Sequence, residues 1–481
     1  MSEERKSGVL MHISSLPSGY SIGSLGKSAF RFIDFLSEAG FSYWQVLPLT
    51  VTDSYFSPYK SRGSFSLNPY FLDLEGLFAR GLITEEELSE AKEKTPYLCE
   101  YERLANDRLD LLYRAAMRVS DRGEVADFFK DEPVLSKTVR FLALRDTFGT
   151  TPWRQWEREA EPDPDRLFFW QLVHYEFLKE WRELKEYASL RGVEIIGDLP
   201  MYVDYDSADV WISPESFLLD KDNLPREVAG VPPDYFSPEG QLWGNPLYNF
   251  RAMRRGGFEF WRSRIEFAYR MFDAVRIDHF RAFDSYYSVR GNAENAMEGK
   301  WNKGPGRTFV KALCEWCGNK TVIAEDLGEV GESVRSLLLY GKMPGMRVIQ
   351  FGTMGGVNSM HLPHTWDGGV FAYTGTHDNN TLLGAIYEMP YEDRKILFDY
   401  FGIRHNDFSL AVTDIIRGML ASRARAVIIP VQDLLCFGRD TRMNIPGVAT
   451  GNWRYRITED NLAILLENSG KWKNINRLYD R

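Results

Sequence analysis

Residues Ala274–Asp278 read AVRID, a short apolar run that ends in a carboxylate. Thr321–Glu325, which reads TVIAE, has the same form, and Val370–Asp378, which reads VFAYTGTHD, reaches its carboxylate through a short turn. Short apolar runs bounded by turn residues are typical of buried strands. In a β/α barrel the C-terminal ends of the strands open onto one shared face. The sequence therefore predicts that these three carboxylates lie together, although they are far apart along the chain.

Strand–helix alternation extends beyond these three runs. Eight strands are predicted, and helical stretches such as Gly257–Arg270, Gly306–Cys317 and Glu332–Tyr340 lie between most of them. Eight strands with crossover helices favour an α/β fold of the (β/α)8 TIM barrel type over an open sheet. The predicted strands are Val9–Ile13, Tyr43–Pro48, Val193–Asp198, Ala274–Asp278, Thr321–Glu325, Arg347–Phe351, Val370–Thr374 and Ala426–Pro430.

The second and third predicted strands are separated by a stretch far longer than an ordinary βα connection. It contains a capping box at Thr84–Glu87 and an apolar stripe, spaced at three and four, from Trp170 to Leu184. We therefore expect a mainly helical inserted subdomain at 75–192, and a further insertion at 199–257 after the third strand. Residues 1–481 are otherwise expected to form a single catalytic barrel, because the chain after the last strand is too short for a C-terminal β-sandwich domain.

Composition excludes several classes of function. The chain has 481 residues and a net charge of −10, which disfavours binding to nucleic acid or an anionic membrane through bulk electrostatics. Its aromatic share of 14% supplies flat amphipathic side chains that can stack on sugar rings. No glycine-rich nucleotide motif follows a strand. The run Val9–Met11 is too short for a signal-peptide core and no run could span a membrane, so a cytoplasmic location is expected.

Cysteine and histidine are too sparse to predict a metal site. Cys314 and Cys317 form an isolated C-x-x-C, for which reduced thiols on one helix face are a better interpretation than a zinc or redox site. His361 and His364 are interpreted as loop or packing histidines. No clustered oxygen ligands indicate calcium. We therefore expect neither a metal nor a cofactor.

The neighbours of the three carboxylates predict different roles for them. Arg276 lies two residues before Asp278, so both side chains point to the same face of a strand, and the guanidinium favours the ionised carboxylate of a nucleophile. Glu325 follows an apolar run, where burial and the charge of Asp278 would raise its pKa, as suits a general acid. Asp378 follows His377 in a turn and could bind sugar hydroxyls. Such a pair of carboxylates can cleave a glycosidic bond.

A structural explanation competes with the catalytic one. Acidic residues after strands often cap the next helix or pair with a basic neighbour. For any one of the three sites, that explanation is as good as catalysis. Three sites in one half of a barrel, one with an arginine on the same face and one with a neighbouring histidine, favour catalysis.

These motifs closely resemble the signatures of amylomaltases, the bacterial 4-α-glucanotransferases of glycoside hydrolase family 77 in the α-amylase-like clan. The segment Gly230–Tyr248 is similar to the active-site loop of that family and is the most specific match. The resemblance runs in the same order along nearly the whole chain. The other matching segments are His12–Pro17, Ser57–Tyr59, Gly197–Pro200, Val275–Arg281, Ala324–Gly328, Thr374–Thr381, Arg442–Asn444 and Gly451–Trp453.

The resemblance implies a role for each catalytic candidate. Asp278 matches the nucleophile that forms a covalent glucosyl-enzyme, Glu325 the acid/base, and Asp378 the carboxylate that stabilises the transition state. Arg276 and His377 match supporting residues of the donor subsite. In a retaining enzyme the nucleophile and the acid/base are about 5–5.5 Å apart.

The resemblance also implies sugar-contacting residues. Tyr59 is similar to a stacking platform for the donor glucose. Tyr235, Phe236 and Trp243 resemble loop aromatics that contact the glucan near the cleavage point, and Asn245 lies in the same loop as a further substrate-binding candidate. Packing within the protein is the alternative for each aromatic residue.

The activity that the resemblance implies is retaining transfer of an α-1,4-glucan segment from a donor malto-oligosaccharide to the 4-hydroxyl of an acceptor glucan or glucose. Starch- or glycogen-derived glucans are the expected partners, and cyclic glucans are an expected side product. Two alternatives stay open, an α-1,4-glucan hydrolase on the same scaffold and a non-catalytic glucan-binding protein. The sequence leaves the oligomeric state open.

Overall fold

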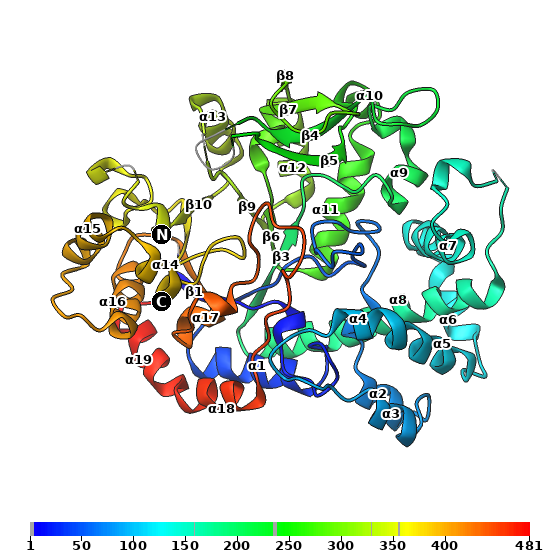
Figure 1. Ribbon diagram of the computed structural model, residues 1–481, viewed down its shortest axis with the longest axis horizontal. Helices are drawn as coiled ribbons and strands as arrows, with labels where there is room; N and C mark the ends of the chain where they lie inside the picture. The colour runs from blue at the N-terminus through cyan, green and yellow to red at the C-terminus, as the bar shows by residue number, and fades with distance from the viewer. Residues whose placement is uncertain (1–3, 158, 234–237, 329, 355) are drawn as a thin grey trace.

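The computed structural model describes residues 4–157, 159–233, 238–328, 330–354 and 356–481 (Figure 1). Within these residues eight parallel strands close into a barrel in the order β1-β12-β11-β10-β9-β6-β3-β2. The predicted (β/α)8 TIM barrel is therefore confirmed. The barrel strands are β1 (Lys6–Leu10), β2 (Tyr43–Gln45), β3 (Glu194–Leu199), β6 (Ala274–Ile277), β9 (Thr321–Ala324), β10 (Gly345–Val348), β11 (Val370–Tyr373) and β12 (Ala426–Pro430).

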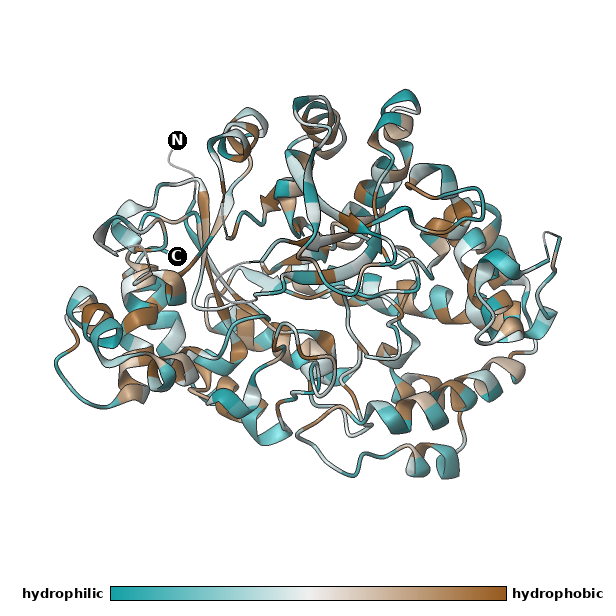
Figure 2. Cartoon of the chain, turned by 45° about the horizontal axis from the view of Figure 1, so that its top comes forward, coloured by the Kyte–Doolittle hydropathy of each residue, from teal (hydrophilic) through white to brown (hydrophobic). Residues whose placement is uncertain are grey.

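The apolar runs become strands because they are covered on both sides. All four residues of β6 and all five of β12 are buried, as expected for parallel strands between a packed barrel interior and a layer of helices. Figure 2 shows apolar residues running along the strands, while the surrounding helices carry both apolar and hydrophilic residues. The register between β3 and β6 places Asp198 beside Arg276. That pairing proves central to the site.

The bounds of three predicted strands were wrong, among them Tyr43–Pro48, because β2 already ends at Gln45. The run Arg347–Phe351 is offset from β10, which begins at Gly345 and gives way to a 3-10 helix at Ile349–Phe351. The run Val9–Ile13 is likewise offset from β1, and Ile13 already belongs to another 3-10 helix. Apolar residues mark burial in both cases, but burial does not distinguish the last residues of a strand from a buried 3-10 turn.

The long connection between β2 and β3 contains α2 to α8, several of which lie on the right of Figure 1. The capping box at Thr84 is present, because its hydroxyl accepts from the N–H of Glu87 and the Glu87 carboxylate accepts from the N–H of Thr84. The stripe of α8 packs against the barrel, where the indole N–H of Trp181 donates to the backbone oxygen of Met271 at 2.8 Å. The helices are α2 (Leu74–Ala79), α3 (Glu85–Glu90), α4 (Tyr101–Arg103), α5 (Leu109–Met117), α6 (Gly123–Lys130), α7 (Pro133–Phe148) and α8 (Pro164–Leu190).

A second, antiparallel sheet was not predicted. Its order is β5-β4-β7-β8, and it lies at the top of Figure 1. Strands β4 (Glu227–Val231) and β5 (Gln241–Pro246) come from the insertion after β3, whereas β7 (Ser285–Arg290) and β8 (Gly299–Lys303) follow β6. The sheet was missed because its strands are short and polar on their exposed side, so they lack the continuous apolar runs of the barrel.

The rest of the described chain, including the segment after β12, is mainly helical. After β12 the described residues form helices and no further strand, so the structure has no C-terminal β-sandwich. None of the helices in the described part of the chain is long and apolar enough to cross a membrane. The remaining helices are α1 (Lys27–Glu38), α9 (Ala208–Ile212), α10 (Phe250–Arg255), α11 (Glu259–Met271), α12 (Arg307–Cys317), α13 (Glu332–Gly341), α14 (Leu382–Glu388), α15 (Tyr391–Phe401), α16 (Phe408–Leu420), α17 (Val431–Leu434), α18 (Glu459–Glu467) and α19 (Ser469–Leu478).

Candidate active site

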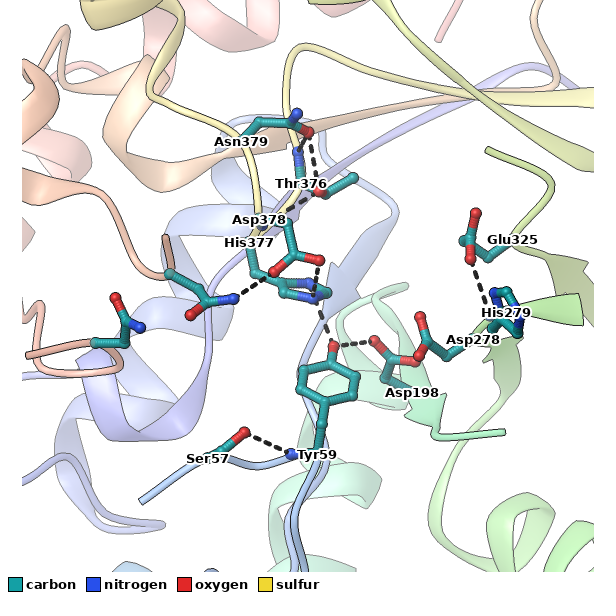
Figure 3. A network of polar contacts seen from close by, with 12 residues as sticks. Ser57, Tyr59, Asp198, Asp278, His279, Glu325, Thr376, His377, Asp378 and Asn379 are labelled. Atoms are coloured by element: carbon teal, nitrogen blue, oxygen red, sulfur yellow. Dashed lines mark hydrogen bonds and ion pairs between the residues drawn. The ribbon is translucent and has the colours of Figure 1, made fainter. Parts of the chain in front are cut away.

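A cleft of about 720 Å³ opens at the C-terminal ends of the barrel strands. Its size and its mixed polar and apolar lining can accommodate several sugar rings. Most of the candidate residues converge there, as the strand-end argument predicts, and Figure 3 shows how they are arranged. Tyr59, Trp243, Asn245, Asp278, His377 and Asp378 are among the residues that line the cleft.

Asp278 follows β6 directly and shares a guanidinium with a second carboxylate. Nη2 of Arg276 lies 2.8 Å from Oδ1 of Asp278, which is the contact that the sequence predicts. Nη1 of Arg276 lies 2.8 and 2.7 Å from the two oxygens of Asp198, whose side chain is fully buried. The side chain of Asp278 is 29% exposed. Arg276 therefore binds Asp278 on its buried side, while the carboxylate remains accessible from the cleft.

Glu325 follows β9 and approaches the residue next to Asp278. Its Oε2 accepts from the backbone N–H of His279 at 2.9 Å, and its Oε1 accepts from the N–H of Leu327 at 2.6 Å. Burial, followed by the negative charge of Asp278, raises the pKa of Glu325 to about 7, although Arg276 and the two N–H groups oppose the shift. A carboxyl group with this pKa is partly protonated at neutral pH and can serve as a general acid and then as a base.

Asp378 has a different environment. Oδ2 of Asp378 lies 3.4 Å from Nε2 of His377, and Oδ1 accepts from the amide of Asn444 at 2.6 Å. Enclosure by the protein raises the pKa of Asp378, but the charge and hydrogen bond of His377, with the hydrogen bond of Asn444, lower it by more. The carboxylate is therefore ionised at neutral pH. Its side chain is 47% exposed and is free to accept hydrogen bonds from a ligand.

A chain of hydrogen bonds connects the Asp198–Arg276 pair with Asp378. The hydroxyl of Tyr59 donates to Oδ2 of Asp198 at 2.7 Å and lies 3.2 Å from Nδ1 of His377. Because the hydroxyl has only one hydrogen, Nδ1 of His377 must donate to it, and Nε2 is then free to donate to Asp378 when the ring is charged. Asp378 accordingly raises the pKa of His377, although burial alone would lower it. The Asp198–Arg276 pair and Asp378 thus form one network.

A sequence profile of 4-alpha-glucanotransferases, glycoside hydrolase family 77, matches residues 11–462. The chain belongs to this family. It is 41% identical over 471 residues to the 4-alpha-glucanotransferase of Aquifex aeolicus, with 95% of this chain and 96% of the relative covered. It is 37% identical over 491 residues to that of Clostridium butyricum, with 98% and 100% covered.

Solved structures agree with the family assignment. The amylomaltase from Streptococcus agalactiae in complex with acarbose superposes with a TM-score of 0.94 at 34% identity, covering 99% of this chain and 100% of that one. The amylomaltase from Corynebacterium glutamicum gives a TM-score of 0.78 at 16% identity over 99% of this chain and 75% of that one, which is evidence for the shared fold. The family resemblance seen in the sequence is therefore confirmed.

The aromatic candidates differ in how much of them faces the cleft. The ring of Tyr59 stacks on that of His377, with centroids 4.8 Å apart, so one of its faces is already covered within the protein. Trp243 on β5 is half-buried and meets His279 edge-to-face at 4.9 Å. The side-chain amide of Asn245 donates to the backbone oxygen of Val203 at 2.9 Å and so attaches β5 to the segment after β3. The other two loop aromatics of the prediction, Tyr235 and Phe236, lie outside the described residues.

Two residues of this family 77 site were undervalued from the sequence. In the sequence, Asp198 and Asn444 stand out only as members of the matching segments Gly197–Pro200 and Arg442–Asn444, with no role of their own. A carboxylate at a fully buried strand position is itself a signal, because such a charge requires a partner. The structure supplies that partner in Arg276. Among the described residues no group of three or more histidines, cysteines or acidic residues is placed to hold a metal ion.

Removal of the Asp198 carboxylate should destabilise the protein strongly. Arg276 is only 4% exposed, and in Asp198→Ala it would lose two of its hydrogen bonds and half of its charge compensation. We expect the free energy of unfolding, measured with urea, to fall by about 3–5 kcal/mol. The control is Asp127→Ala, which breaks an exposed pair with Lys130 and should cost less than about 1 kcal/mol. Equal losses in the two variants would contradict this prediction.

Proposed function

We propose that the chain transfers segments of α-1,4-glucan between malto-oligosaccharides with retention of configuration. The observation that carries this proposal is the difference between the environments of the three carboxylates. Asp278 is held by Arg276, Glu325 has a pKa near neutrality, and Asp378 is ionised beside His377. These are the states that a nucleophile, an acid/base and a sugar-binding carboxylate require.

In the first step Asp278 attacks the anomeric carbon of the donor sugar, and Glu325 gives its proton to the departing glycosidic oxygen. The glucan on the acceptor side leaves, and a covalent glucosyl-enzyme remains. Asp378 accepts hydrogen bonds from hydroxyls of the distorted donor ring, and these bonds strengthen in the transition state. His377 supports this by donating to Asp378.

In the second step the 4-hydroxyl of an acceptor glucan or of glucose enters. Glu325, now ionised, removes its proton, and the new α-1,4 bond forms as Asp278 is released. Transfer predominates over hydrolysis when an acceptor sugar reaches the intermediate before water. Trp243 of the β4–β5 hairpin and Tyr202 both line the cleft, and their rings contact each other. Their apolar surface favours binding of an acceptor sugar over water beside the intermediate.

The substrates follow from the cleft and from the family. A cleft of this size, lined by aromatic and polar side chains, suits malto-oligosaccharides and the ends of starch- or glycogen-derived glucans. Acarbose, bound in the Streptococcus agalactiae structure, is the ligand with which the cleft is best probed.

Incubation with maltotriose tests transfer against hydrolysis. We expect glucose together with a ladder of longer oligosaccharides, because the transferred segment joins a second glucan rather than water. Chromatography of the products over time gives the result. Maltose and glucose without any longer product would show a hydrolase, and tight binding of maltotriose without any turnover would show a binding protein.

A further inference from the structure

The loop that carries Asp378 is held at both of its ends by the same side chain. Residues 374–381 connect β11 to α14. Oδ2 of Asp433 accepts from the hydroxyl of Thr374, the first residue of this loop, at 2.5 Å. Oδ1 of Asp433 accepts from the backbone N–H of Leu382, immediately after the loop, at 2.7 Å. One carboxylate therefore sets the distance between the two ends of this loop.

Gln350 makes a second connection of the same kind. Its side-chain amide donates to the backbone oxygen of Thr374 and to that of Asn380, both at 2.9 Å. Gly375 allows this approach, because a Cβ atom there would come within 2.7 Å of Nε2 of Gln350. The loop therefore closes tightly around two polar side chains that come from outside it.

The two side chains come from the two strands that flank β11 in the barrel. Gln350 follows β10, and Asp433 lies in α17, directly after β12. Asp433 is 1% exposed and Thr374 is fully buried, so water does not compete for these bonds. Burial raises the pKa of Asp433 to about 6 against the two hydrogen bonds that lower it, so the group is mainly ionised at neutral pH. In that state it accepts from both donors.

Asp433 is not needed to start α14. The hydroxyl of Thr381 already caps that helix by accepting from the N–H of Gly384 at 3.0 Å. The bond from Leu382 to Asp433 is additional, and its effect is to tie the start of the helix to the end of β11. This separates a loop-positioning function from ordinary helix capping.

We propose that Asp433 and Gln350 are positioning residues for the transfer reaction, which hold the loop so that Asp378 meets the donor sugar in the correct place. We call the pair the loop clamp. The inference rests on the role proposed above for Asp378. The loop clamp touches no substrate and acts only through the loop that it closes.

Asp433→Ala should lower kcat on the order of 10²-fold, the scale of a misplacement of about 1 Å in a reacting group. KM should change by less than about threefold, because Asp378 contributes mainly in the transition state. Asp433→Asn should restore most of kcat, since its oxygen accepts from Leu382 while the Thr374 hydroxyl rotates to accept from its amide. Gln350→Ala should behave like Asp433→Ala. All rates are measured as disproportionation of maltotriose.

A structural control separates positioning from general stability. Ser7→Ala removes a buried hydrogen bond to Asn476, 2.8 Å long, from β1 outside the cleft. It should lower the unfolding temperature without lowering kcat. The positioning role proposed for the loop clamp is wrong if kcat falls equally in Ser7→Ala and Asp433→Ala. It is also wrong if kcat falls equally in Asp433→Ala and Asp433→Asn.

A double-mutant cycle with Asp378→Asn tests the route of action. If the loop clamp works through Asp378, Asp433→Ala should reduce kcat far less when Asp378 is already replaced. If the effects of the two substitutions on kcat are fully additive, the positioning role of the loop clamp is overturned and the role of Asp378 is left intact. Wild-type activity of Asp378→Asn alone would instead overturn the role proposed for Asp378, so the two failures are distinguishable.

Discussion

Asp278→Asn should abolish transfer while the protein stays folded and continues to bind glucan. An amide cannot form the glucosyl ester, and the loss of a nucleophile reduces kcat on the order of 10⁴- to 10⁶-fold. The fold should survive because Arg276 retains both oxygens of Asp198 at 2.8 and 2.7 Å and can still donate to the asparagine oxygen. Turnover of maltotriose gives the loss, and calorimetry with acarbose shows whether binding is retained.

The matched control is Asp198→Asn, which alters the other carboxylate on the same guanidinium. It leaves the nucleophile in place, so it should keep far more activity than Asp278→Asn. Normal turnover in Asp278→Asn would show that the nucleophile is another residue. Loss of acarbose binding in that variant would show that Asp278 matters for the shape of the site and not only for its chemistry.

Glu325→Gln should reduce transfer from maltotriose by about 10²- to 10⁴-fold, the usual contribution of general acid–base catalysis. Glutamine cannot protonate the departing oxygen, nor can it take a proton from the acceptor. A maltosyl fluoride donor should recover the first step, because fluoride leaves without a proton. A maltosyl-enzyme should then accumulate, and mass spectrometry should locate the maltosyl adduct on the peptide that contains Asp278. An adduct on another peptide would contradict the role of Asp278 as the nucleophile, and failure of the fluoride donor to restore the first step would contradict the role of Glu325 as the acid.

The pH profile provides an independent check on Glu325. The first step needs the protonated form, and the pKa of Glu325 is raised to about 7. The rate with maltotriose should therefore decline as pH rises through about 7. In Glu325→Gln with the fluoride donor this decline should disappear, since no proton is transferred to the leaving group. A decline that persists unchanged there would assign it to another group.

Much of the fold could be predicted from local pattern. The strands of the barrel are buried on both sides, so runs such as Ala274–Ile277 and Ala426–Pro430 are visible without any knowledge of their partners. The capping box at Thr84 is equally local, because both of its hydrogen bonds join residues three apart. The antiparallel sheet that includes β7 and β8 was missed, since one of its faces is open and its apolar runs are interrupted.

In the candidate site, too, contacts between neighbouring residues could be predicted and contacts between different strands could not. The sequence placed Asp278, Glu325 and Asp378 at strand ends, and it paired Arg276 with Asp278 because residues two apart on a strand face the same way. It did not pair Arg276 with Asp198. That contact joins residues 78 positions apart and depends on the register between β3 and β6.

By itself, then, the sequence determined the barrel, the family and three acidic residues of the candidate site, because burial periodicity and short motifs are properties of neighbouring residues. Only the tertiary structure decided how those residues are held. The hydrogen bonds that Asn444 donates to Asp378, that Tyr59 donates to Asp198, and that Thr374 and Leu382 donate to Asp433 all join segments that belong to or follow different strands. Contacts of this kind arise when the barrel closes and fixes its register, and no local pattern in the chain specifies them.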